Sequence, residues 1–340
     1  MNPVELPEIA ELVATYLEGK DLGTCVCVSR TWRDMFLRYR WRVVRAGILK
    51  IFWSSDAPVS IGPHRTDIYN YRHWIQDLTL VNMFAALDVC QYPNLRRLKV
   101  DMKNSLAPSN RVSMDPVTMA PSLIDLELCK VDMPPSFWET LSTHPHIRKL
   151  DLSDMRLKKD DTPGFWKTCM KLESLNIDIY FEDDGGIPRN VVFDQMRNLN
   201  MRGMDLNQNP YQLHLILQSP MLEFLNWEID SLKEIEERII DSRWRQLKKL
   251  RINGVFVTDN ELAFLLNAVG NGHGGIEDLA LHRCDLETRV FEALSVHFST
   301  LVKVDTRFAS LRKRSIPCDL LCLCPRLEVY AKDIAERGPW

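Results

Sequence analysis

Three groups of residues have types and spacings that could support chemistry. Residues 270–275 read G-x-G-x-x-G, which is the glycine spacing of a dinucleotide-binding loop. Thiol and imidazole groups, the usual zinc ligands, occur at close spacing in three places: Cys25 with Cys27; His144 with His146; and Cys318, Cys322 and Cys324. The chemistry to test is therefore cofactor binding and metal coordination.

The elements that must position these residues do not fit either chemistry. The glycine motif follows a predicted helix and precedes a predicted strand, whereas a dinucleotide needs the strand first, so that the helix N-terminus faces the phosphates. We interpret it as a helix end and a loop. No phosphate-binding G-x-x-x-x-G-K-S/T motif exists, because Gly19-Lys20 is followed by Asp21. Cys25 and Cys27 are two apart on a predicted helix, so their thiols diverge by about 200°.

The remaining thiol and imidazole groups stand at the approaches to predicted strands. Cys318, Cys322 and Cys324 share a leucine-rich helix that stops at Pro325, and His144 and His146 flank Pro145. With eight His and nine Cys in the chain, a triad of distant residues stays open, but no pattern points to one. We therefore expect no catalytic residues, no metal and no cofactor, and a protein that is not an enzyme.

Composition predicts a folded protein without polyanion partners. The chain has 340 residues, 45% of them hydrophobic, and its 43 Lys and Arg against 46 Asp and Glu give a net charge of −3. No global positive field is present to hold nucleic acid or anionic lipid, and no segment approaches the roughly 18 apolar residues that span a bilayer. The start lacks a secretory signal, and the scattered, odd-numbered cysteines are typical of a reducing compartment. We expect an intracellular protein, cytoplasmic or nuclear, with no nucleic-acid or membrane partner.

An internal repeat decides the expected architecture. The pattern apolar-x-x-apolar-x-apolar recurs at intervals that average about 25 residues, within the 20–29 residue period of leucine-rich repeats. Its central residues are Leu78, Leu98, Leu126, Leu150, Leu175, Leu199, Leu225, Leu250, Leu279, Val304 and, in a degenerate last copy, Tyr330. Eleven copies in register predict one strand per repeat.

The spacing also predicts which way each residue faces. Residues two apart on a strand share a face, so the central and following apolar residues are expected in the core. Proline precedes the pattern in five copies, for example Pro121 and Pro220, where it ends a helix and favours an extended approach. Between strands, 137–141 and 261–266 have helical periodicity. The predicted fold class is α/β: a curved solenoid with parallel strands on the concave side and helices on the convex side.

These repeats resemble the leucine-rich repeats of F-box proteins, in which L-x-x-L-x-L-x-x-C-x-x-I/L-T-D-x-x-L is common. Residues 250–262 contain the whole pattern with Val255 in place of the cysteine, and Leu279, Leu281, Cys284 and Leu286 include the cysteine itself. Other copies keep only the strand, so the resemblance is to an irregular, fungal-like subtype.

The first 45 residues have a helical period. Ile9, Leu12, Val13, Tyr16 and Leu17 predict one apolar stripe on a helix that Pro7 begins and Gly19 ends. A second helix, with Asp21 as its cap, is predicted by the stripe Cys25, Val28, Trp32, Met35 and Phe36.

The same segment resembles an F-box, with Leu6-Pro7, Tyr16-Leu17, Asp21-Leu22, Val28-Ser29-Arg30-Thr31-Trp32 and Trp41-Arg42 at the family's motif positions. Leu6-Pro7-Glu8-Ile9 is one residue shorter than the commoner Leu-Pro-x-Glu-Ile. F-boxes bind a Skp-family adaptor that links them to a cullin-RING ubiquitin ligase. The resemblance implies that nine residues divide between the helical core and the adaptor groove: Leu6, Pro7, Ile9, Leu12, Leu17, Leu22, Cys25, Val28 and Trp32.

The expected organisation is an F-box-like helical domain over 1–45, a linker and solenoid cap over 46–74, and about 11 irregular repeats over 75–340. The resemblance implies a substrate-recognition subunit whose solenoid binds a target protein for ubiquitination. The alternative is a repeat scaffold with a helical cap and no ligase role. The expected target-binding surface is the solvated row of the strands: Lys99, Glu127, Asp151, Asn176, Asn200, Phe224, Asn226, Arg251 and Asp305.

Overall fold

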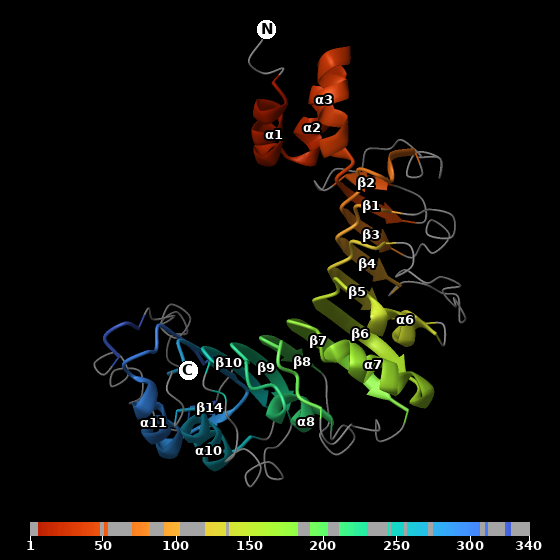
Figure 1. Ribbon diagram of the computed structural model, residues 1–340. Helices are drawn as coiled ribbons and strands as arrows, with labels where there is room; N and C mark the ends of the chain where they lie inside the picture. The colour runs from red at the N-terminus through yellow and green to blue at the C-terminus, as the bar shows by residue number, and fades with distance from the viewer. Residues whose placement is uncertain are drawn as a thin grey trace. The chain divides into compact units, whose positions relative to one another are not determined.

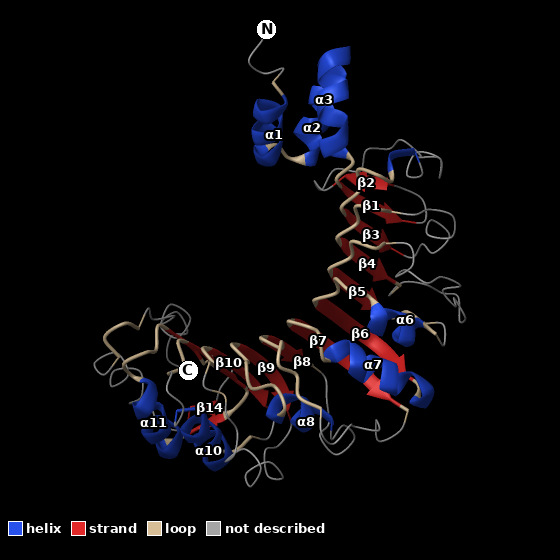
Figure 2. Ribbon diagram, in the orientation of Figure 1, coloured by secondary structure: helices blue, strands red, loops and turns tan. Residues whose placement is uncertain are grey.

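A computed structural model describes residues 6–47, 51–53, 70–81, 92–102, 120–133, 136–182, 191–202, 211–229, 244, 246–254, 257–270, 275–306, 310–311 and 324–327. The chain comprises two compact units, Met1–Arg156 and Leu157–Trp340. Figure 1 shows the order of the elements, and Figure 2 shows that within each unit the helices between strands lie on one side of the sheet.

The first unit joins three helices to a sheet. Helices α1 (Pro7–Tyr16), α2 (Gly19–Val28) and α3 (Arg30–Arg40) precede strands β1 (Val43–Gly47), β2 (Ile51–Trp53), β3 (Asp77–Val81), β4 (Arg97–Asp101), β5 (Asp125–Cys129) and β6 (Lys149–Leu157), with α6 (Phe137–Thr143) before β6. The sheet order is β2-β1-β3-β4-β5-β6, antiparallel between β1 and β2 and otherwise parallel. The sheet thus begins at Val43, ahead of the first expected strand.

The second unit repeats strand and helix. Its strands β7 (Ser174–Phe181), β8 (Asn198–Met201), β9 (Phe224–Ile229), β10 (Lys249–Gly254), β11 (Asp278–His282) and β13 (Lys303–Asp305) are parallel neighbours in that order, and β12 (Asp285–Leu286) pairs with β14 (Ser310–Leu311). The helices are α7 (Thr162–Cys169), α8 (Tyr211–Leu217), α10 (Asp259–Gly270) and α11 (Thr288–Leu294), with short 3₁₀ turns at Lys159–Asp161 and Ser295–His297.

The register confirms the repeat pattern. Leu78, Leu98, Leu126 and Leu150 are aligned in the first unit, and Leu175, Leu199, Leu225, Leu250, Leu279 and Val304 in the second. All of these except Val304 are buried, as is the apolar residue three positions before each. Each of these leucines is buried against the corresponding leucines of the two neighbouring strands. A single repeat therefore cannot bury its own apolar face. The last expected copy, centred on Tyr330, lies outside the described residues.

One hydrogen-bond motif sets the start of each strand. The residue immediately before a strand, here termed the approach residue, uses its carbonyl to accept two N–H groups from the next repeat. For example, Arg96 and Arg97 both donate to the Gln76 carbonyl, at 2.8 and 3.0 Å. The approach residues therefore stack at the strand spacing of about 4.8 Å. They are Arg42, Gln76, Arg96 and Ile124 in the first unit and Glu173, Arg197, Glu223, Lys248 and Glu277 in the second.

A left-handed residue recurs four positions after the central leucine. Lys130, Asp154 and Arg283 have φ of 54°, 53° and 56°, a conformation that costs non-glycine residues free energy. The turn buries the next residue of each repeat, Val131, Met155 or Cys284. The buried Cys284 thus occupies the cysteine position of the repeat pattern.

Aromatic rings fill the space between strands and helices. The expected helices over 137–141 and 261–266 form α6 and α10. In the second unit Trp166 is fully buried, with its ring centroid 5.9 Å from that of Phe181 and 6.1 Å from that of Phe193. Tyr211 packs on Phe181 at 4.2 Å, and burial raises the pKa of its phenol.

Two buried histidines join neighbouring repeats through hydrogen bonds. The buried His297 accepts a hydrogen bond from the Ile276 N–H at Nδ1 (3.3 Å) and donates from Nε2 to the Leu266 carbonyl (3.0 Å). Burial lowers its pKa. His144 makes the corresponding Nε2 contact with the Ala120 carbonyl at 3.1 Å. In the described part of the chain no group of His, Cys, Asp and Glu is arranged to hold a metal ion, and no helix has the length and apolar character to cross a bilayer.

The structure corrects two details of the helical segment. The stripe expected on one second helix crosses a break, because Ser29 ends α2 and caps α3 by accepting from the Trp32 N–H at 3.1 Å. Gly19 and Asp21 lie inside the first turn of α2, whose N-cap is Glu18, so Asp21 is not the cap. Serine is a preferred N-cap residue, and Ser29 begins a new helix at this point. The spacing of apolar residues does not reveal such a break, because the stripe continues across it.

Candidate protein-binding surfaces

The three helices have their own core. Ala10, Ala14, Leu22 and Phe36 are buried together, and seven partly buried residues pack against them: Val13, Leu17, Cys25, Val26, Trp32, Met35 and Tyr39. Trp32 and Phe36 rings lie 5.4 Å apart. Four of the nine residues that the F-box resemblance singled out, Leu17, Leu22, Cys25 and Trp32, therefore belong to this core.

The other five predicted adaptor residues are exposed. Leu12 and Val28 are 56% and 60% exposed, Leu6 and Ile9 are 39% and 37% exposed, and Pro7 is exposed too. Tyr16, at 83% exposed, joins them. We call Leu6, Ile9, Leu12, Tyr16 and Val28 the apolar helix set. Packing divides the predicted stripe on α1: Val13 and Leu17 pack against the core beside the alanines, while Ile9, Leu12 and Tyr16 are exposed.

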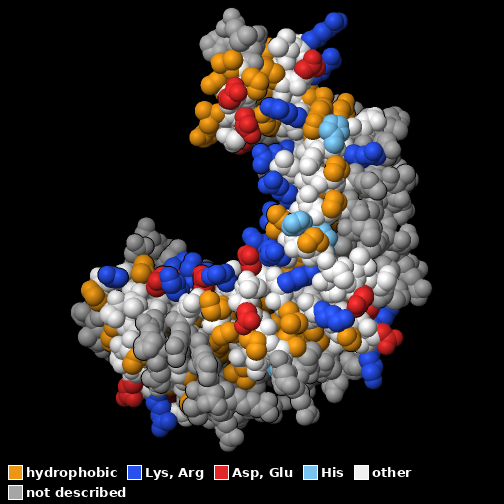
Figure 3. All heavy atoms as spheres, viewed as in Figure 1, with side chains coloured by type: hydrophobic (Ala, Val, Ile, Leu, Met, Phe, Trp, Pro, Cys, Tyr) orange, Lys and Arg blue, Asp and Glu red, His pale blue; other side chains and the backbone are white. Residues whose placement is uncertain are grey.

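Exposure of large apolar side chains on a small helical segment indicates a contact surface. Figure 3 shows hydrophobic side chains on the surface of the three helices in this view. Fully burying a Leu, Ile or Val side chain contributes about 1.5–3 kcal/mol relative to leaving it in water, so the apolar helix set is the part of this segment that gains most from a partner.

Most residues of the predicted target-binding row are half-exposed. In the first unit Lys99, Glu127 and Asp151 are aligned across β4, β5 and β6, with an ion pair between Lys99 and Glu127. In the second unit Asn176, Asn200, Asn226 and Arg251 form the corresponding row. The Asn226 amide donates to Asn200 Oδ1 at 2.7 Å.

Two members of the row behave differently. Phe224 lies in the adjacent row, and the Arg251 guanidinium carbon is 5.6 Å from its ring centroid, which makes a cation–π contact. Asp305 is buried, not solvated, and its Oδ2 lies 3.3 Å from His282 Nε2. At β13, the last strand of this sheet, the alternation reverses, since Val304 is only half-buried.

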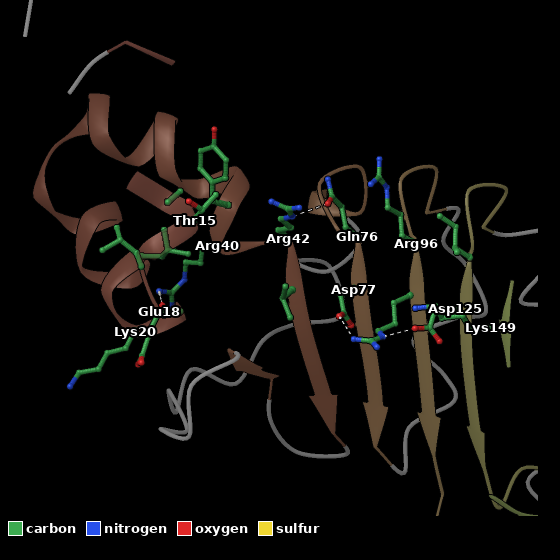
Figure 4. Close-up of a pocket in the computed structure, with 18 residues that line it drawn as sticks. Thr15, Glu18, Lys20, Arg40, Arg42, Gln76, Asp77, Arg96, Asp125 and Lys149 are labelled. Atoms are coloured by element: carbon green, nitrogen blue, oxygen red, sulfur yellow. Dashed lines mark hydrogen bonds and ion pairs between the residues drawn. The ribbon is translucent and has the colours of Figure 1, made fainter. Parts of the chain in front are cut away.

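A cleft of about 1100 Å³ in the first unit lies between the helices and the starts of the strands. Figure 4 shows Thr15, Glu18, Lys20 and Arg40 on the helical side, and Arg42, Gln76, Arg96, Asp125 and Lys149 along the strand starts. Its lining includes six basic residues and three acidic ones, with apolar positions such as Leu17 and Ile124.

The charges on the cleft wall are unevenly compensated. Arg97 lies 3.0 Å from Asp125 Oδ2 and 3.7 Å from Asp77 Oδ2, and Asp125 contributes most to raising the pKa of its guanidinium. Burial outweighs the neighbouring Arg97 charge and raises the pKa of Asp77. Arg42 uses Nε to donate to a neutral amide, Gln76 Oε1, at 2.8 Å.

Sequence reasoning missed this cleft because it considered the two solvated positions within each strand and not the approach residue. The available signal was a polar residue two positions before most of the central leucines, for example Gln76 before Leu78, Arg96 before Leu98 and Arg148 before Leu150. That the helical segment would close the other side of the cleft has no counterpart in the sequence pattern.

No protein-family model and no curated protein sequence matches the chain. Among solved structures, a chain from the crystal structure of the yeast Rad7 and Elc1 complex matches with 12% sequence identity and a TM-score of 0.42. The match covers 91% of this chain and 77% of that chain. At this similarity it carries no functional information, so the surfaces themselves are the guide to function.

Proposed function

We propose that this protein is a non-enzymatic, intracellular substrate-recognition subunit of a cullin-RING ubiquitin ligase. Its F-box-like helices would bind a Skp-family adaptor, and its repeats would bind the protein to be ubiquitinated. The transfer chemistry would belong to the partners.

The apolar helix set carries the proposal. A helical segment that only capped the first repeat would direct its large apolar residues toward the sheet or its own core. Here the core of the three helices is built around alanines and Phe36, while Leu12, Tyr16 and Val28 remain more than half exposed. The F-box resemblance gives this apolar set an occupant, the Skp-family adaptor, whose contact would remove it from water.

A pull-down of the purified chain with a Skp-family adaptor tests the adaptor contact. Leu12→Glu combined with Val28→Glu should abolish retention, because each places a charge in a contact that must be desolvated. Val296→Glu is the matched control: Val296 is also 51% exposed but belongs to the second unit. Thermal melting should be the same for all three chains. A folded wild type that is not retained, or a double variant retained like the control, would contradict the proposal.

A second experiment separates an appended domain from a cap. Deletion of residues 1–40 keeps Trp41, whose ring packs on Tyr71 at 4.5 Å, and keeps all of β1. An appended adaptor-binding domain should leave the remaining sheet folded with an unchanged far-UV circular dichroism signal per repeat. Loss of cooperative unfolding in the truncated chain would favour the capped scaffold instead.

A further inference from the structure

The approach residues differ in charge between the two units. In the second unit they alternate in sign as Glu173, Arg197, Glu223, Lys248 and Glu277, so each basic residue stands between two acidic ones, and ion pairs join Arg197 to Glu223 and Lys248 to Glu277. In the first unit the corresponding row has Arg42, Gln76, Arg96 and Ile124, with no acidic member. The same backbone motif therefore carries a row of alternating charge in the second unit, whereas the described row of the first unit has two arginines and no carboxylate.

The basic residues that line the cleft differ in whether a carboxylate lies beside them. Arg42, Arg96, Lys20 and Lys149 are cleft residues that make no ion pair with any described residue, whereas Arg97 is held by Asp77 and Asp125. Figure 3 shows Lys and Arg side chains gathered along this edge of the first unit. A cleft wall lowers the dielectric around such charges and strengthens their attraction for an anion.

The geometry favours an extended chain over a small molecule. At about 1100 Å³ the cleft is slightly larger than ordinary ligand pockets, which have volumes of roughly 300–1,000 Å³ and mostly apolar linings. Twelve of the eighteen residues that line this cleft are polar or charged. Arg42 and Arg96 stand before β1 and β4, two strand spacings apart, which is about 10 Å. In an extended polyproline II segment, which has three residues per turn and rises about 3.1 Å per residue, side chains at i and i+3 point the same way and lie about 9 Å apart. Two carboxylates at these positions can therefore reach both guanidinium groups.

The charge pattern favours polypeptide over nucleic acid. Nucleic-acid sites are parts of strongly basic domains, but this chain has a net charge of −3. The carboxylates of Glu18, Asp77 and Asp125 in the lining would repel a continuous run of phosphates. A peptide can place acidic side chains at the cations and neutral ones elsewhere.

We propose that the cleft between the helices and the strand starts of the first unit binds an extended acidic segment of a partner protein, with Arg42 and Arg96 as the principal anchors. The proposal deepens the proposed function, because the segment would belong to the recruited target. It requires no adaptor, so it stands or falls independently of the pull-down.

Fluorescence anisotropy with a labelled peptide tests it. The probe has glutamate at every third position, separated by glycine and serine, and the same peptide with glutamine is the probe control. Arg42→Gln/Arg96→Gln should weaken binding of the glutamate peptide at least roughly tenfold, since each guanidinium makes a charge-assisted contact. Arg197→Gln/Lys248→Gln is the matched control: the same row and the same charge change, but in the second unit. It should bind like the wild type.

Several results would overturn the proposal. These are absence of binding by the folded wild type, equal binding of the glutamate and glutamine peptides, or equal losses in the two double variants. Tighter binding of a labelled single-stranded oligonucleotide than of the glutamate peptide would assign the cleft to nucleic acid instead. Unchanged thermal melting of both double variants, whose substituted side chains lie at the surface, keeps each comparison valid.

Discussion

The Asp259 carboxylate should be one of the main links between two repeats of the second unit. It begins α10, yet it accepts hydrogen bonds from three N–H groups at the start of the next helix, α11: Glu287 at 2.7 Å, Arg289 at 3.2 Å and Val290 at 3.2 Å. The N-cap residue of α11, Glu287, makes no side-chain capping bond of its own. Asp259 therefore caps a helix that begins 29 residues further along the chain.

Asp259→Ala should lower the free energy of unfolding by about 1.5–2.5 kcal/mol. Loss of an N-cap side chain costs about 0.5–2 kcal/mol, and loss of a negative charge at a helix N-terminus adds about 0.3–1 kcal/mol. Asp259→Asn keeps an acceptor oxygen but not the charge, so about half of that loss is expected. Asp194→Ala, at an exposed turn position of the same unit, is the control and should change stability by less than about 0.5 kcal/mol.

Urea denaturation followed by circular dichroism and tryptophan fluorescence measures these differences. The order of stability should be wild type and Asp194→Ala, then Asp259→Asn, then Asp259→Ala. Equal stabilities of Asp259→Ala and Asp194→Ala would show that water satisfies the three N–H groups equally well. In that case the contact of the Asp259 carboxylate with the start of α11 does not stabilise the second unit.

Three further outcomes are expected. Burial lowers the pKa of His297 in the folded chain, so as the pH falls the unfolded chain takes up this proton first. The free energy of unfolding should therefore be constant above about pH 7.5 and decrease as the pH drops through about 6.5 toward the folded-state pKa. A His297→Gln chain whose free energy of unfolding in urea has the same pH slope would contradict this. Gly275→Ala should destabilise by about 1–3 kcal/mol, because the new methyl meets the Thr300 side chain, and adding Thr300→Ala should recover part of that loss in a double-mutant cycle. Cys27 is exposed and Cys169 buried with a raised pKa, so iodoacetamide at pH 8 should label Cys27 in the native chain and Cys169 only after unfolding, as mapped by mass spectrometry; native labelling of Cys169 would be inconsistent with its burial.

The repeats were predictable because their physics is local and repeated. A strand face has a period of two, and a leucine at each central position, such as Leu126 or Leu225, can be buried only if its neighbours supply the same face. A pattern repeated at ten further positions averages out the failures of any one copy. The burial of Asp305 was not predictable, because it depends on the neighbouring strand, where His282 Nε2 lies 3.3 Å from the Asp305 carboxylate, and not on the period of its own strand.

The helical segment shows the limit of periodicity. Apolar spacing placed helices over the first 40 residues, but both Val13 and Leu12 satisfy a helical stripe, and only packing decides which side meets Phe36. The side of α1 that carries Ala10 and Ala14 is the buried one, because small side chains allow the helices to approach closely. A pattern built on large apolar residues does not include these alanines.

Residue types and repeat spacing therefore determined by themselves the α/β repeat architecture, the buried leucine rows and the solvated row between them. The tertiary structure alone decided which apolar residues of α1 and α2 remain exposed, and that Arg42 and Arg96, 54 positions apart in sequence, stand along one wall of a cleft. The physical reason is that burial periodicity is encoded along the chain, whereas the compensation of a charge depends on which carboxylate the fold brings beside it.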